Sequence, residues 1–340
     1  MPLLLHTLRK LSTSSIARLL TTSPPHYRNM STTTTSPFST YTITPSTLSA
    51  ALTSPPPPST TRIIPLCSTW FLPNSPHSST QTYRHSRIPS SRFFDLDAVK
   101  DPHSPYPHML PPPQHFSAAM RELRIRRSDT VVVYDSAELG LFSAPRVGWT
   151  FRVMGHERVH VLDNFKRWVE GGYAVESGEP APVAKEEVEE SGYPVPDVEL
   201  GGKVVGFGEM KELVQKGGGQ VQILDARPYG RWAGTAPEPR PGLESGHMPG
   251  SISVPHSELL DPKSGTLLPR EELRRVFEKK GVDFEKPVVS SCGTGVTAAV
   301  VDMALEVAEV GRHGRRVYDG SWTEWAQRVK EDEGLIEKEG

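Results

Sequence analysis

The stretch Pro287-Val-Val-Ser-Ser-Cys292-Gly-Thr-Gly-Val-Thr297 combines three local signals. Its β-branched valines, which follow a proline, predict a short buried strand over 287–291. A helix is predicted to begin near Val296, because apolar residues recur at helical spacing in Val296, Ala299, Val300, Met303, Ala304 and Val307. Cys292 therefore stands between a strand end and a helix start.

The residues between the strand and the helix favour a reactive cysteine. Gly293 and Gly295 allow the backbone to turn its N–H groups inward, and such a ring of donors at a helix N-terminus stabilises a thiolate. The alternative is a buried structural cysteine that lies beside a turn. The order strand, Cys, Gly-x-Gly, Thr, helix favours the nucleophile.

Length and composition limit the class of protein. A chain of 340 residues predicts about two domains. Its two cysteines, Cys67 and Cys292, are far apart and form no CxxC pair, so neither a disulfide framework nor a zinc site is expected. We expect no metal and no cofactor. No apolar run approaches the roughly 18 residues of a membrane helix, so no membrane partner is expected.

The formal net charge of -2 is unevenly distributed. Residues 1–94 contain no Asp or Glu but eight basic residues, which are Arg9, Lys10, Arg18, Arg28, Arg62, Arg84, Arg87 and Arg92. The rest of the chain carries an excess of acidic residues, which argues against a nucleic-acid partner.

The N-terminal segment 1–38 is rich in Ser and Thr and lacks acids. Its leucines lie near helical spacing beside Arg9 and Lys10, which is typical of a mitochondrial presequence, and the basic pair argues against a secretory signal. A disordered Ser/Thr tail is the alternative. A second start at Met30 would add a cytoplasmic form.

The remaining sequence predicts two α/β units. Short strands alternate with helices over 40–170 and again over 201–333, which favours a mostly parallel sheet flanked by helices in each unit. Strands are predicted at 62–66, 130–134, 220–224, 251–254, 287–291 and 316–318, and helices at 114–124, 144–154, 164–170, 269–280, from 296, and around Trp322 and Trp325. Residues 171–200 are predicted to form a linker, and residues 334–340 are predicted to form a tail.

The two units also match in register. Val131-Val-Val-Tyr-Asp135 aligns with Val288-Val-Ser-Ser-Cys292, and Asp163 follows Asp135 by 28 residues as Asp319 follows Cys292 by 27. Two copies of one fold explain these intervals. The first copy carries Asp135 where the second carries its cysteine.

These motifs together resemble the tandem-domain rhodanese superfamily, and within it the 3-mercaptopyruvate sulfurtransferases. The resemblance covers roughly 45–330 and depends on four segments, which are Asp225-Ala-Arg227, Arg231-Trp-Ala-Gly-Thr-Ala-Pro-Glu-Pro-Arg240, Ser245-Gly-His-Met-Pro-Gly250 and Cys292-Gly-Thr-Gly-Val-Thr297. It implies two rhodanese-like domains, of which the second carries the catalytic site facing the first.

The resemblance also implies roles for single residues. Cys292 would carry a persulfide, and the loop residues Gly293, Thr294, Gly295, Val296 and Thr297 would surround it. Arg231 and Arg240 would bind the carboxylate and keto group of the donor, although exposed arginines are common in any protein. Thr294, His108 and Asp97 would form a hydroxyl, histidine and carboxylate relay, in which the family usually has Ser in place of Thr294.

The implied activity is transfer of sulfur from the small-molecule donor 3-mercaptopyruvate to a thiol acceptor such as thioredoxin or glutathione, or to cyanide, with release of pyruvate. The alternative is thiosulfate:cyanide sulfurtransfer, but the loop lacks the cationic residues that accompany a dianionic donor. A rhodanese-like phosphatase would need Arg six residues after the cysteine, where this chain has Ala298. A non-catalytic sulfur carrier is the third alternative.

Four other prominent residues are predicted to be structural. His247 lies in a Gly-His-x-Pro-Gly turn and is expected to bond local backbone. Trp322 and Trp325, three residues apart on a helix, are expected in the core. Cys67 stands at a predicted strand end and is expected to be a small apolar filler.

Overall fold

The computed structural model describes residues 36–54, 61–181, 192–217 and 219–339. Met30 and most of the predicted presequence lie outside these residues, as does the acidic run 185–190 of the predicted linker. Within the described ranges, no helix is long and apolar enough to cross a membrane.

The chain forms two parallel five-stranded sheets. The first contains β1 (Thr42–Ile43), β2 (Ile63–Cys67), β3 (Arg92–Phe93), β4 (Thr130–Tyr134) and β5 (Val159–Leu162), in the order β1-β5-β4-β2-β3. The second contains β6 (Val204–Val205), β7 (Gln222–Asp225), β8 (Ile252–Ser253), β9 (Val288–Ser291) and β10 (Arg315–Tyr318), in the order β6-β10-β9-β7-β8. Each strand of one sheet has its counterpart at the same place in the other, so the predicted fold class is confirmed.

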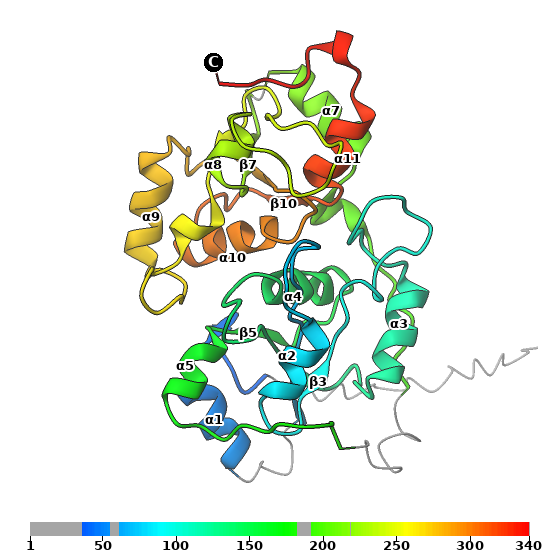
Figure 1. The fold of residues 1–340 in the computed structure, drawn as a ribbon, viewed down its shortest axis with the longest axis vertical. Helices are drawn as coiled ribbons and strands as arrows, with labels where there is room; N and C mark the ends of the chain where they lie inside the picture. Colours follow the sequence, from blue (N-terminus) through cyan, green and yellow to red (C-terminus); the bar gives the residue numbers. More distant parts are fainter. Residues whose placement is uncertain (1–35, 55–60, 182–191, 218, 340) are drawn as a thin grey trace, which may run out of the picture. The chain divides into compact units, whose positions relative to one another are not determined.

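Helices flank both sheets (Figure 1). They are α1 (Pro45–Thr53), α2 (Ser79–His85), α3 (Pro113–Glu122), α4 (Ala144–Val153) and α5 (Phe165–Glu170) beside the first sheet, and α7 (Phe207–Gln215), α8 (Tyr229–Trp232), α9 (Arg270–Lys279), α10 (Ala298–Ala308) and α11 (Ser321–Arg328) beside the second. The central strands β4 and β9 are buried along their whole length, as expected for parallel strands covered on both faces.

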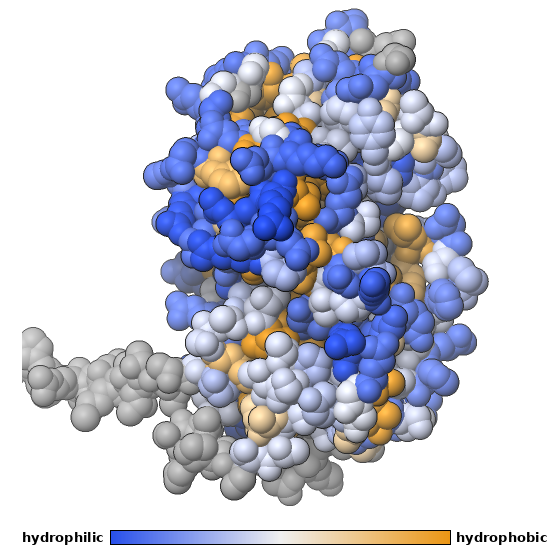
Figure 2. Space-filling model, turned by 90° about the vertical axis from the view of Figure 1, so that its left-hand side faces the viewer, coloured by the Kyte–Doolittle hydropathy of each residue, from blue (hydrophilic) through white to orange (hydrophobic). Residues whose placement is uncertain are grey.

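The amphipathic sequence of helix α9 determines which of its faces is buried. Its apolar Leu273 and Phe277 are fully buried, whereas charged residues occupy the exposed side. This helix lies on the side of the molecule that faces the viewer in Figure 2, where hydrophilic side chains cover much of the surface.

The two sheets are joined through α4 and α10, which pack against each other (Figure 1). One apolar cluster contains residues of both helices, including Val147 and Phe151 of α4 and Met303 and Ala304 of α10. The strand end that carries Cys292 therefore lies next to elements of the first half.

The structure contains elements that the sequence did not predict. The helices α1 and α2 are rich in Ser and Thr, which have modest helix propensity, and each begins with a side-chain cap, from Thr44 and Ser78. The edge strands β1, β3 and β6 have only two residues each, too few for a pattern.

Two segments expected to be loose contain packed residues. Tyr193, within the predicted linker, is buried and stacks with His156. In the predicted C-terminal tail, Leu335 is buried and its carbonyl accepts the Nε1–H of Trp325. Apolar side chains in both segments therefore have partners that composition alone did not indicate.

Candidate active site

Cys292 follows the last residue of β9 and is buried, with 2% of its surface exposed. The start of α11 holds the surrounding loop, because the N–H of Trp322 donates to the Cys292 carbonyl at 2.8 Å and that of Thr323 to the Gly293 carbonyl at 2.9 Å. The N–H of Cys292 donates to Ser321 Oγ at 3.1 Å. The cysteine thus lies in a fixed loop at the carboxyl end of a parallel sheet, where α/β folds place their ligand sites.

Gly295 in this loop cannot be replaced without strain. Its φ angle is +76°, in the left-handed region, and a Cβ atom there would lie 2.8 Å from Nη1 of Arg146 and from the carbonyl oxygen of Asp319. Both neighbours belong to well-packed elements. The second glycine of the Gly-x-Gly pattern is therefore required by backbone geometry and by close packing.

The structure brings together Thr294, His108 and Asp97. Nδ1 of His108 lies 3.0 Å from Oγ1 of Thr294, and its Nε2 lies 3.2 Å from Oδ1 of Asp97. The Nε1–H of Trp70 donates to the other oxygen of Asp97 at 2.9 Å. Because a carboxylate only accepts hydrogen bonds, neutral His108 carries its proton on Nε2 and leaves Nδ1 to accept from the threonine hydroxyl.

The environment keeps His108 neutral. Burial lowers the pKa of His108 below its ordinary value, and the hydrogen bond and charge of Asp97 offset this only in part. The pKa of Asp97 is also lowered, chiefly by its hydrogen bond to His108. The pair therefore consists of an ionised carboxylate and a neutral imidazole at physiological pH.

Arg231 and Arg240 both line the cavity that contains Cys292, but their surroundings differ. Arg231 forms a close ion pair with the buried Glu238, and its Nε donates to Oε2 of the same carboxylate at 3.0 Å. Within the described residues no carboxylate pairs with Arg240. Burial lowers the pKa of the Arg240 guanidinium, and the positive charge of Arg231 lowers it further, so an anionic ligand would be favourable there.

The cavity beside Cys292 is small, with a volume of about 100 Å³. A cavity of this size admits a small ligand. Both halves form its walls, since Trp70, Leu72 and Phe142 come from the first half and Arg227, Val296 and Thr297 from the second. Access to the cysteine therefore depends on both copies of the fold.

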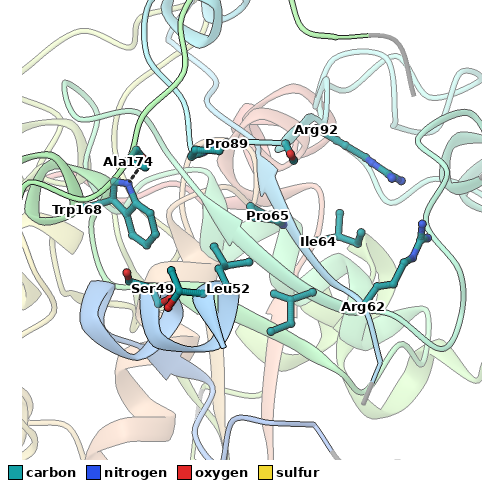
Figure 3. A pocket seen from close by; sticks show the side chains of 12 residues that line it. Ser49, Leu52, Arg62, Ile64, Pro65, Pro89, Arg92, Trp168 and Ala174 are labelled. Carbon is teal, nitrogen blue, oxygen red and sulfur yellow. Dashed lines mark hydrogen bonds between the residues drawn. The ribbon is translucent and has the colours of Figure 1, made fainter. Parts of the chain in front are cut away.

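A larger cavity, of about 530 Å³, lies beside the amino end of β2 (Figure 3). Figure 3 shows Trp168 and Ala174 on one side of it and Arg62 and Arg92 on the other. Both arginine head groups are engaged elsewhere, because Arg62 pairs with Asp129 at 2.7 Å and Arg92 donates to the Leu123 carbonyl. Cys292 is not among its lining residues, and the cavity lies at the amino end of the first sheet, whereas Cys292 follows the carboxyl end of β9 in the second.

The equivalent position in the first half is occupied by a carboxylate. Oδ2 of Asp135 accepts the backbone N–H groups of Phe142, Ser143 and Ala144 at 2.9, 2.8 and 2.8 Å. These donors lie at the start of α4, as the loop N–H groups of the second half lie before α10. The first half thus fills its own anion site with Asp135.

Most residues predicted to be structural behave as expected, since Trp322, Trp325 and Cys67 are buried. The expectation for His247 was wrong in one respect: its Nδ1 lies 2.9 Å from the carbonyl oxygen of Trp232, which is 15 residues away and not part of its own turn. Burial raises the pKa of the Cys67 thiol to about 12, so it stays protonated.

Sequence reasoning missed Trp70 and Glu238. Trp70 supports Asp97 and its ring lies edge-on to His108, with centroids 4.4 Å apart. Glu238 holds Arg231, and its other oxygen pairs with Arg227 at 2.7 Å. Glu238 lies inside the quoted segment 231–240, whereas Trp70 lies outside the four segments on which the resemblance depends; the partners of both residues are determined by the fold.

A model of the rhodanese-like domain matches residues 207–328, the part of the chain that contains Cys292 and both arginines. The fold agrees with this match in the second half and repeats in the first. The crystal structure of the Tum1 protein from Saccharomyces cerevisiae superposes with a TM-score of 0.79 at 37% identity, covering 87% of this chain and 97% of that one.

Two relatives extend the comparison to the whole folded chain. A thiosulfate/3-mercaptopyruvate sulfurtransferase of Arabidopsis thaliana, described as mitochondrial, is 41% identical over 275 residues, which are 77% of this chain and 71% of the relative. The 3-mercaptopyruvate sulfurtransferase of Homo sapiens is 35% identical over 278 residues, 81% of this chain and 89% of the relative. The chain therefore belongs to the tandem rhodanese family of sulfurtransferases, which are enzymes that transfer sulfur.

Proposed function

We propose that this enzyme takes sulfur from 3-mercaptopyruvate onto Cys292 as a persulfide and passes it to a thiol acceptor. The observation that supports this most strongly is that Cys292, Thr294, Arg231 and Arg240 share one small cavity, with His108 against Thr294. A nucleophile, an anion-binding pair and a proton relay are the parts that this reaction needs.

The charge of the cavity supports a singly charged donor. Arg227, Arg231 and Arg240 line it, and the carboxylates of Asp225 and Glu238 pair with the first two. Arg240 has no carboxylate partner within the described residues, so it is free to pair with the single carboxylate of mercaptopyruvate. The thiosulfate dianion would bring one more negative charge into a buried site that already holds the Cys292 thiolate.

In the proposed first step, the Cys292 thiolate attacks the sulfur atom of mercaptopyruvate. A sulfur–sulfur bond forms, the sulfur–carbon bond breaks, and its electron pair remains on the departing three-carbon unit as the enolate of pyruvate. A proton on that carbon completes pyruvate. Backbone N–H groups of Gly293 to Thr297 stabilise the terminal persulfide anion.

The relay supplies the proton transfers. Neutral His108 accepts a proton through the Thr294 hydroxyl from the donor thiol and returns it to the enolate, while Asp97 holds the imidazole in the required tautomer. Arg231 and Arg240 hold the carboxylate and keto oxygen of the donor.

In the second step an acceptor thiolate attacks the outer sulfur of the persulfide, takes that sulfur, and regenerates the Cys292 thiolate. Thioredoxin and glutathione are the proposed thiol acceptors, and cyanide is an alternative. The names of the relatives include thiosulfate as a donor, so thiosulfate:cyanide sulfurtransfer is the second candidate activity.

We also propose the domain limits and the location. Residues 40–170 form the non-catalytic domain, 171–200 the linker and 201–333 the catalytic domain. The mitochondrion is the proposed compartment, supported by the acid-free basic N-terminal segment and by the relative described as mitochondrial. A start at Met30 would give a cytoplasmic form, and fractionation of cells that carry Met30→Ala tests it.

The decisive kinetic experiment compares kcat/KM for mercaptopyruvate and thiosulfate, each with cyanide and with reduced thioredoxin as acceptor. We expect mercaptopyruvate to be preferred and Cys292→Ser to be inactive with both donors. A preference for thiosulfate contradicts the charge argument, and turnover by Cys292→Ser contradicts the persulfide.

A further inference from the structure

We propose that Arg146, contributed by the half that lacks the cysteine, is the positioning residue that holds His108 against Thr294. Arg146 lies in the first turn of α4 and is buried, with 1% of its surface exposed. This inference depends on the proposed role of the His108 relay.

Two hydrogen bonds place Arg146 between the halves. Its Nη2 donates to the backbone carbonyl of His108 at 2.6 Å and to Oδ1 of Asp319 at 2.5 Å. The other oxygen of Asp319 accepts the N–H of Leu110 at 2.8 Å. One buried ion pair thus fixes the short segment 108–110 to the residue that follows β10.

The same side chain lies under the Cys292 loop. Nη1 of Arg146 is the atom that a Cβ on Gly295 would approach to 2.8 Å, and the guanidinium lies 4.6 Å from the ring centroid of Trp149. Within the described residues, Nε and Nη1 make no hydrogen bond. Burying an arginine with unsatisfied N–H groups is unfavourable, so a role beyond stability is expected for it.

His108 needs such support because of its backbone. Its φ angle is +61°, a conformation that is strained for residues with a side chain. Without a hydrogen bond to its carbonyl, the residue is free to relax toward an ordinary conformation and withdraw its ring from Thr294. Arg146 supplies that hydrogen bond from a rigid helix.

The internal repeat provides a natural comparison. In the second half the N–H of Leu267 donates to Asp163 at 2.9 Å, as that of Leu110 does to Asp319, and Gly265 has a φ of +67° at the position equivalent to His108. Within the described residues, no basic side chain pairs with Asp163. The fold can therefore tether this loop without an arginine, and the arginine is present only where the loop carries the histidine.

A double-mutant cycle tests the proposal. We expect Arg146→Met to lower kcat with mercaptopyruvate on the order of 10²-fold with KM little changed, because misplacing a proton-transfer group affects the chemical step. His108→Asn is the second variant, since Asn tolerates a positive φ. If the arginine acts through His108, the double variant loses no more than His108→Asn alone.

Two further variants guard against a merely structural effect. Arg152→Met removes another α4 arginine that bridges the halves, through Glu306 at 2.6 Å, without touching His108, and we expect its kcat to stay near that of the wild type. Arg146→Lys keeps the charge but cannot reproduce the planar guanidinium, and we expect an intermediate loss. If Arg146→Met does not fold, Arg146→Lys takes its place in the cycle.

A spectroscopic readout separates positioning from stability. In protein labelled with ¹⁵N-histidine, the His108 signal is assigned by its absence in His108→Asn, and we expect the Nε2–H tautomer in the wild type and in Arg152→Met but a mixture in Arg146→Met. The proposal is overturned if the fold-losses in kcat of the two single variants multiply in the double variant. It is also overturned if both Arg146 variants keep the wild-type tautomer and the wild-type kcat. Full activity of His108→Asn instead contradicts the relay itself.

Discussion

Oγ1 of Thr294 lies 3.0 Å from Nδ1 of His108, although 186 residues separate them in the chain. The first residue follows the cysteine of one copy of the fold, and the second belongs to a loop of the other copy. Arg146 of the first half likewise contacts the second half, at Asp319. The half without Cys292 therefore contributes residues that contact the Cys292 loop of the other half.

The threonine hydroxyl is expected to be essential, and the methyl group beside it is not. We expect Thr294→Val, which keeps the shape but removes the hydroxyl, to lower kcat by about 10²–10⁴-fold, the range for loss of a general acid–base group. Thr294→Ser keeps the proton path and should retain most of the activity. Wild-type turnover by the valine variant in a steady-state assay rules out the relay.

The pH profile reports the state of His108. Because burial lowers its pKa below the ordinary 6.5, the neutral, proton-accepting form persists to lower pH than for a free histidine. Activity is present above the lowered folded pKa and is lost as pH falls through it, and the associated stability is lost in the same direction. We expect an acid limb of kcat/KM below pH 6.5 that is absent in His108→Asn. If the acid limb is unchanged in His108→Asn, a group other than His108 causes it.

Glu238 is expected to set the choice of donor. Its carboxylate pairs with both Arg231 and Arg227, so Glu238→Gln removes one negative charge and makes the cavity more positive by one unit. We expect the ratio of kcat/KM for thiosulfate to that for mercaptopyruvate to rise by about 10-fold, since a hydrogen-bonded charge contributes roughly 1.5–3 kcal/mol.

The control for that prediction is Glu244→Gln, which removes an exposed carboxylate paired with Lys338 at 2.8 Å. It should leave the donor ratio unchanged. An equal shift in both variants means that the overall charge of the protein, and not the pairing of Arg231, governs donor choice.

Asp163 is expected to make the protein less stable as pH rises. Burial raises its pKa from 3.8 to about 6, and only the N–H of Leu267 offsets this. Its contribution to stability is fully present below about pH 4 and is lost as pH rises through 6. Since the side chain is partly exposed, we expect a loss of about 1–2 kcal/mol.

Denaturant unfolding at pH 4.5 and pH 7.5 measures this loss. Asp163→Asn keeps an oxygen that accepts the N–H of Leu267, but it cannot ionise. Between the two pH values its free energy of unfolding should therefore fall by about 1–2 kcal/mol less than that of the wild type. Equal pH dependence in the two proteins shows that Asp163 does not titrate in this range.

Much of the fold follows from local pattern. The β-branched runs at 130–134 and 288–291 and the apolar repeat of α10 predict their elements closely, because burial on all sides leaves a strong signal. The helices α1 and α2 left no such signal. Their Ser- and Thr-rich sequences become helical through caps and through tertiary packing of Leu48 and Tyr83.

The site shows a similar division. Cys292 and its glycines were identified from local order, and His108, Asp97 and the arginines from motifs. No spacing rule predicts that Glu238 occupies two donors of Arg231, or that Arg146 of one half lies under Gly295 of the other. The first contact depends on the conformation of the segment 231–240, and the second arises only when α4 packs against α10.

The most direct test of the persulfide is mass spectrometry of the intact protein after brief exposure to mercaptopyruvate, with the acceptor omitted and the excess donor removed. The account predicts a mass increase of one sulfur atom, located on the peptide that contains Cys292 and released by a thiol acceptor, with an equal amount of pyruvate formed. No added sulfur on Cys292 while pyruvate is still produced, or an equal mass increase in Cys292→Ser, contradicts it.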